Sequence, residues 1–286
     1  ANAAPAAREA ARRALAAHGE ASARAAALAS ARAALASAAP ELRASARDVL
    51  AQLAPAEGVS ALLALAADAP LVERQRAWAA LAHAGDARAE AELSRALDAH
   101  AAGTLAADVQ LDVLEAARAH GGAALAAKLA AYESALPADD LVARYAFALA
   151  GGDAARGARV FESETAECMR CHGSGGHGAG AGPDLTGVSK RHDVRGLLQS
   201  VLLPQAQIAA GFGSVAVTLR DGSVVNGVQV SESASEVVVD TGEGEPRRIA
   251  LRDVATRTPP ASAMPPTALG LAPRELRDLI AHLQTR

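Results

Sequence analysis

Two cysteines and one histidine form the most informative chemical pattern of the chain. Cys168 and Cys171 are its two cysteines, and His172 directly follows the second one. C-x-x-C-H is the attachment sequence of c-type haem, in which two thiols add to the two vinyl groups of the porphyrin and the histidine supplies a neutral imidazole nitrogen to the iron. The sequence therefore predicts one haem c, bound covalently through Cys168 and Cys171, with His172 as an iron ligand.

Two other sites use closely spaced cysteines. A zinc half-site needs two further Cys or His ligands at short spacing, and here His177 is available but a second cysteine pair is absent. A thioredoxin-like redox pair should follow a strand of a βαβ unit. The segment before Cys168, residues 153–161, instead has the composition of a helix.

The second iron ligand is expected from the methionines, of which the chain has two. Met169 lies between the cysteines and cannot reach the opposite face of the haem. Met264 remains, in a loop over residues 262–266 that prolines make stiff enough to hold a weak ligand. The alternative for Met264 is a gap-filling core residue. Three histidines stay open as alternative distal ligands: His177, His192 and His282.

Composition divides the chain near Gly151 and Gly152. Alanine fills 61 of residues 1–150 but 18 of residues 151–286, while glycine rises from 6 to 18. Domains are therefore predicted over residues 1–150 and 151–286. The first is rich in strong helix formers and is expected to be α-helical throughout. Helix breaks are predicted at Pro40, Pro55, Gly58, Pro70, Gly85, Gly103, Gly121, Gly122 and Pro137.

These breaks predict helical hairpins that begin near Glu41, Leu71 and Ala106. Such hairpins resemble degenerate HEAT-like repeats, in which each hairpin buries its apolar face on a neighbour. A plain helical bundle is the alternative. Residues 1–38 are expected to form a long helix, a cap or a lead-in segment.

The second domain mixes helices with a β-rich insert at about residues 212–258. Helices are predicted over residues 152–163, 194–203 and 272–283, and strands over 215–219, 224–230, 237–239 and 248–251. The last helix should pack its apolar face on Val160 and Phe161; this face carries Leu276, Leu279, Ile280 and Leu283. The fold class expected is mostly α, with a small β-barrel-like insert in the C-terminal haem domain.

The flanks of the motif resemble a class I cytochrome c. The helix predicted up to Phe161 comes before C-x-x-C-H, and Gly182-Pro183-Asp184-Leu185 is similar to the Gly-Pro-x-Leu of that family. The resemblance implies that the Pro183 carbonyl accepts a hydrogen bond from His172 and that Leu185 packs on the haem. It also implies that Phe161, at the end of this helix, is a cofactor-binding residue, and it places an axial methionine in a loop like that of Met264.

A narrower resemblance covers about residues 152–286. Residues 217–228 and the run from Gly182 to Lys190 are similar to the haem-binding domain first recognised in planctomycetes and verrucomicrobia, and the insert also resembles a small SH3- or Sm-like barrel. In that family the domain often closes a longer chain, after helical repeats and a sugar-dehydrogenase-like propeller. The resemblance implies a dehydrogenase or respiratory-chain partner, or a chain that is one piece of a larger complex.

Composition excludes several classes of function. The net charge is −4 without a basic stripe, and aromatic residues make up 2%, which argues against nucleic-acid binding. No stretch approaches the roughly 20 consecutive apolar residues of a membrane span. In bacteria covalent haem is attached outside the cytoplasm, and the small residues at the start resemble a mature N-terminus after signal-peptide removal. A periplasmic location is therefore expected.

Three functions compete at this point. A haem iron held from both sides transfers single electrons but has no open position for substrate chemistry, which predicts an electron-transfer protein rather than an enzyme. A haem enzyme or a gas or redox sensor would need a displaceable sixth ligand. A scaffold subunit would use the helical repeats and the insert as interaction surfaces.

Overall fold

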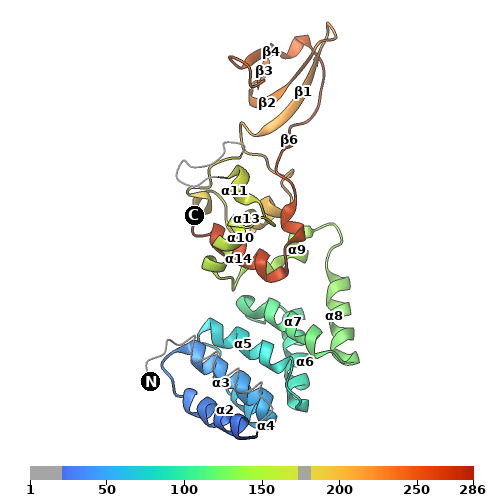
Figure 1. The fold of residues 1–286 in the computed structure, drawn as a ribbon. Coiled ribbons are helices and arrows are strands. Elements are labelled where there is room, and N and C mark those ends of the chain that lie inside the picture. The colour runs from blue at the N-terminus through green and yellow to red at the C-terminus, as the bar shows by residue number, and fades with distance from the viewer. Residues whose placement is uncertain (1–20, 173–181) are drawn as a thin grey trace. The chain divides into compact units, whose positions relative to one another are not determined.

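A computed structural model describes residues 21–172 and 182–286. The fold is mostly α-helical, with a small antiparallel sheet in the C-terminal region (Figure 1). The chain divides into two compact units, Ala1–Gly151 and Gly152–Arg286, each with its own packing. None of the helices described is both long and apolar enough to span a bilayer.

Helices of the first unit follow one another through short turns. They are α2 (Ala21–Ala34), α3 (Pro40–Leu53), α4 (Pro55–Leu63), α5 (Leu71–Leu81), α6 (Ala87–Ala101), η1 (Ala107–Val109), α7 (Gln110–His120), α8 (Ala123–Ala135), α9 (Leu141–Arg144) and η2 (Ala146–Leu149). The expected hairpin starts near Glu41, Leu71 and Ala106 coincide with the starts of α3, α5 and η1. Helix α3 packs on both α4 and α5, α5 on α7, and α6 on both α7 and α8. Each pair thus buries its apolar face against the next pair.

Gly58 does not break a helix, so that prediction is wrong. It lies inside α4, where this helix crosses α3 so closely that a Cβ on Gly58 would come within 2.2 Å of the Ala51 backbone nitrogen. A glycine weakens a helix interior but allows two backbones to approach. The sequence alone cannot separate a glycine at a helix crossing from a glycine at a helix end.

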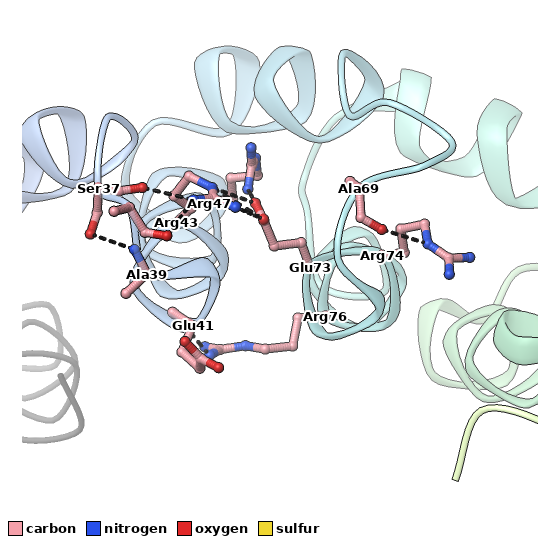
Figure 2. Close-up of polar contacts among 10 residues, drawn as sticks. Ser37, Ala39, Glu41, Arg43, Arg47, Ala69, Glu73, Arg74 and Arg76 are labelled. Carbon is pink, nitrogen blue, oxygen red and sulfur yellow. Dashed lines mark hydrogen bonds and ion pairs between the residues drawn. The ribbon is translucent and has the colours of Figure 1, made fainter. Parts of the chain in front are cut away.

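A buried carboxylate fixes α3 against α5. Glu73 of α5 is 2% exposed, and it accepts hydrogen bonds from Arg43 and Arg47 of α3 (Figure 2). Arg43 also donates to the carbonyl of Ser37 at 2.8 Å, just before α3 begins. Because a buried charge is costly unless it is paired, the two arginines fix how these helices lie on each other.

The second unit has helices that flank the cysteines and close the chain. They are α10 (Ala154–Glu162), α11 (Cys168–Cys171), α12 (Val188–Arg191), α13 (Val194–Leu202), η4 (Thr267–Gly270) and α14 (Pro273–Leu283). The three helices predicted here are present as α10, α13 and α14, with ends within two residues of those expected.

Helix α10 crosses α14 at a glycine. A Cβ on Gly157 would lie 1.9 Å from the carbonyl oxygen of Asp278, so only glycine fits at this crossing. The Asp278 carboxylate is buried and accepts from the Asp153 backbone N–H at 2.7 Å and from Arg156 Nε at 2.6 Å. These bonds join the two ends of the unit.

The apolar face of α14 is buried as predicted, with Leu276, Leu279, Ile280 and Leu283 each at most 5% exposed. On α10 the most buried side chain is Phe161, at 4% exposed, while Val160 is half-buried.

The sheet lies between α13 and η4 in the chain. Among the residues described it has six strands: β1 (Gly213–Leu219), β2 (Val224–Glu232), β3 (Glu236–Asp240), β4 (Arg247–Ala250), β5 (Val254–Arg257) and β6 (Ala261–Ser262). Their order is β4-β3-β2-β1-β5, and β6 also pairs with β1. Alternating side chains form the core of the sheet: Val215, Val217, Val225, Val237, Val239 and Ile249.

Strands β5 and β6 have no counterpart among the strands that the sequence predicts. Ser262, the first residue of the predicted loop, and Ala261 before it pair with Gly213 and Ser214 of β1. A strand of two residues is too short to show an alternating pattern, and the surrounding prolines hide it further.

Candidate haem-binding site

Both cysteines lie on the single turn of α11. Residues three apart on a helical turn share one side, so the two thiols lie next to each other. Both are free and half-buried, and the His172 backbone N–H continues the turn by donating to the Cys168 carbonyl at 2.9 Å. Glu167, directly before the turn, has a φ of 52°, the left-handed region that side chains other than glycine rarely adopt. The chain is therefore held in a strained conformation where the site begins.

The environment of Cys168 does not suit a redox disulfide. Burial raises the pKa of this thiol to about 11, and Sγ lies 3.5 Å from the Ala166 carbonyl oxygen, to which it donates. Thioredoxin-like pairs depend instead on a lowered thiol pKa. The element before the pair is helix α10 rather than a strand, as expected. Both observations argue against the redox alternative.

One hydrogen bond selects the tautomer of the neutral His172 ring. Its Nδ1 lies 2.9 Å from the carbonyl oxygen of Pro183, which is the bond that the resemblance implies. A carbonyl oxygen only accepts, so Nδ1 carries a proton, and in the neutral imidazole Nε2 is then the nitrogen with the free lone pair. An imidazole held in this tautomer is ready to bind a metal through Nε2, and the carbonyl increases its basicity.

Gly182 allows the His172 ring to approach the chain. A Cβ on Gly182 would lie 2.9 Å from His172 Cε1, closer than real Cβ atoms come, and 3.0 Å from Nδ1. Its backbone N–H donates to the Cys171 carbonyl at 3.1 Å. Gly182 begins the Gly-Pro-x-Leu motif, but the sequence does not predict it as a site residue. Only the fold shows that it lies against the His172 ring.

The segment after Pro183 is fastened by polar contacts of its own. Asp184 accepts from the Thr186 backbone N–H at 2.7 Å, and Arg191 donates to the carbonyls of Thr186 at 2.8 Å and of Asp184 at 3.1 Å. Arg191 thereby fixes the stretch that carries the Pro183 carbonyl. Leu185 is half-buried in this stretch, and its packing on a cofactor stays a prediction.

Met264 lies between β6 and η4 and is half-buried. Its backbone N–H donates to Ser262 Oγ at 3.2 Å. Three residues further on, Thr267 Oγ1 donates at 3.3 Å to the Ala166 carbonyl, the same oxygen that Cys168 Sγ contacts. The segment that carries Met264 is thus bonded to Ala166, two residues before the cysteine turn, and ligation by Met264 stays a prediction.

The other histidines fall into different surroundings. His177 lies outside the described residues. His192 ends α12 and packs beside Gly196 of the next helix. His282 of α14 lies against Phe161, with ring centroids 5.6 Å apart, and its Nε2 accepts from Arg286 Nε at 3.1 Å.

His282 and Phe161 therefore pack α10 on α14. Burial lowers the pKa of His282, and the charge of Arg286 lowers it further. The contacts of Phe161 are with His282 and Arg286, so its place at a cofactor also stays a prediction.

Zinc binding would need further Cys or His ligands, and His177, the one that the sequence offers nearby, lies outside the described residues. Residues 21–172 and 182–286 hold no group of three or more His, Cys, Asp or Glu side chains that could bind a metal ion. Two thiols on one turn and an imidazole with an unprotonated Nε2 fit a covalently attached haem.

Comparison with known proteins agrees with this site. Residues 154–217 match the family model of cytochrome c. The matched segment includes α10, the C-x-x-C-H turn and Pro183, and it ends inside β1, while Met264 lies beyond it. No curated protein matches the chain. The match supports a c-type cytochrome domain, the class of haem-based electron carrier in which haem c is bound covalently.

Proposed function

We propose that this chain is a periplasmic mono-haem c-type cytochrome that transfers single electrons. It acts as the electron-accepting subunit or module of a dehydrogenase or respiratory complex. The observation that carries the proposal is the hydrogen bond from His172 Nδ1 to the Pro183 carbonyl, directly after two free thiols on one helical turn. The cytochrome c match over residues 154–217 supports it independently.

Each residue of the site has a defined role in this proposal. Cys168 and Cys171 would hold the haem covalently through their thiol sulfurs, and His172 Nε2 and Met264 Sδ would be the iron ligands that the chain supplies. When bound, the haem exchanges one electron between its ferric and ferrous forms. A thioether ligand favours the ferrous form and raises the potential.

The compartment and the partner are part of the same proposal. Haem is attached covalently outside the bacterial cytoplasm, which supports the periplasm. In the first unit α3 packs on α5 and α5 on α7, a succession that supports HEAT-like repeats. Repeats of this kind offer a surface for a partner protein, and we assign that role to residues 1–150. Helical repeats before a haem domain with a β-rich insert also support the planctomycete and verrucomicrobial type.

Intact-mass analysis tests the haem itself. The protein is produced in a bacterial periplasm together with the haem-attachment machinery, beside the double variant Cys168→Ala, Cys171→Ala. We expect the wild-type mass to exceed that of the polypeptide by one haem, and the variant to carry none. Bare wild-type polypeptide, or zinc at the site, overturns the proposal.

Spectra of Met264→Ala test the sixth ligand. The variant should lose the iron–sulfur charge-transfer band, and its reduction potential should fall. Reduced wild-type protein should resist carbon monoxide at neutral pH, since both axial positions are filled. An unchanged band removes Met264 as a ligand, and rapid stoichiometric binding of carbon monoxide by the wild type favours a sensor or enzyme instead.

A further inference from the structure

The β-sheet and the segment that carries Met264 are continuous in the chain. Strand β6 ends at Ser262, two residues before Met264, and Figure 1 shows it at the base of the sheet, on the segment that leads to η4 and α14. The sheet is therefore placed to control how this segment lies.

Gln205 holds the end of β6. The Gln205 side-chain amide donates from Nε2 to the Ser262 carbonyl at 2.9 Å, and its Oε1 accepts from the Ser262 backbone N–H at 2.8 Å. The side chain thus satisfies both backbone groups of Ser262, as a neighbouring strand would. Ser262 Oγ in turn accepts from the Met264 backbone N–H at 3.2 Å. Three hydrogen bonds lead from Gln205 to Met264.

Strand β1 holds the same segment from the sheet. Gly213 pairs with Ser262, and a Cβ on Gly213 would lie 2.8 Å from Cβ of Pro260. A proline ring cannot turn aside as a flexible side chain does, so any larger residue here must move Pro260. The first residue of β1 therefore sets the path of the chain four residues before Met264.

We infer that Gln205 and Gly213 are positioning residues for the Met264 sulfur, so that the β-sheet sets the sixth iron ligand and with it the reduction potential. The inference rests on the proposed function. A thioether is a weak, neutral ligand, and a freely moving loop loses conformational entropy each time it binds. Holding Ser262 in place removes part of that cost before ligation, which favours the methionine-bound form.

The test compares Gln205→Leu with a matched control, Gln199→Leu, in the haem-loaded form of the 286-residue chain. Gln199 is another exposed glutamine, on α13, while the side-chain hydrogen bonds to the Ser262 backbone come from Gln205. In Gln205→Leu the methionine-free population should rise about tenfold, the size expected for losing one or two exposed hydrogen bonds. The measurements are the charge-transfer band, the potential, and the rate of carbon monoxide binding to the reduced protein.

Two further variants test whether the loss of the charge-transfer band follows the contacts that each substitution removes. Gln205→Glu keeps the acceptor for the Ser262 N–H but loses the donor to the Ser262 carbonyl. Its methionine-free population should therefore lie between that of wild type and that of Gln205→Leu. Gly213→Ala should move Pro260 and weaken the band in the same direction, while circular dichroism checks that the fold is kept.

The outcomes separate this inference from the proposed function. If Met264→Ala abolishes the band while Gln205→Leu and Gly213→Ala behave like Gln199→Leu, the positioning role is wrong and the proposed ligand stands. If Met264→Ala leaves the band unchanged, the ligand is wrong and the positioning role is lost with it.

Discussion

The two sides of the candidate haem site are held in different ways. On the His172 side the contacts are short-range, since His172 and Pro183 are 11 positions apart. On the Met264 side they are long-range: Gln205 reaches Ser262 across 57 positions, and Thr267 reaches Ala166 across 101. The difference suggests a division of roles. The contacts of His172 lie within one short stretch of chain, while those of the Met264 segment depend on residues from distant parts of the sequence.

The largest effect should come from crowding the histidine side with Gly182→Ala. The new Cβ must push against the His172 ring, at 2.9 Å from Cε1, and break its alignment with Pro183. Overpacking of this kind costs about 1–3 kcal/mol. We expect a lower free energy of unfolding by denaturant and a smaller fraction of chains that carry haem.

The control for this prediction is Gly270→Ala, because a Cβ at Gly270 meets nothing within 4 Å. If both variants unfold at the same denaturant concentration, the close approach at Gly182 does not constrain the ring.

A smaller effect is expected on the methionine side from Thr267→Val. Valine keeps the shape of threonine but removes the Oγ1 donor to the buried Ala166 carbonyl. Losing this bond should cost about 1 kcal/mol of unfolding free energy and speed carbon monoxide binding by the reduced protein. Thr267→Ser keeps the hydroxyl and should stay close to wild type. Equal rates of carbon monoxide binding for Thr267→Val and Thr267→Ser would show that the hydrogen bond to Ala166 does not hold the segment that carries Met264.

The same contrast explains what could be predicted from the sequence. The residues around His172 could be predicted because haem attachment requires fixed residue types at fixed spacing. The hydrogen bond from His172 to Pro183 is present, as the resemblance implies. Helices α10, α13 and α14 were predictable because 3.6-residue periodicity survives in a short segment.

Long-range partners leave no such periodic signal. Gln205 is an exposed glutamine without a motif, and its role exists only because folding brings Ser262 to it. The helix break predicted at Gly58 is wrong for a related reason, since the role of this glycine depends on the Ala51 backbone of another helix.

The smallest predicted effect concerns pH and the α10–α14 contact that both sides of the site share. Burial lowers the pKa of His282 below its ordinary 6.5, as does the Arg286 charge, while the Ala154 backbone and Glu162 oppose them more weakly. His282 of the unfolded chain therefore takes up a proton at a higher pH than His282 of the folded chain. The stabilisation that neutral His282 gives the fold is complete above pH 6.5 and decreases as pH falls from there toward the folded pKa. Wild type should therefore lose more unfolding free energy than His282→Phe between pH 7.5 and pH 5.5. Burial also lowers the pKa of His100, but that histidine titrates in both proteins, so the difference between them isolates His282. Identical losses in the two proteins would mean that His282 takes up its proton without disturbing the contact.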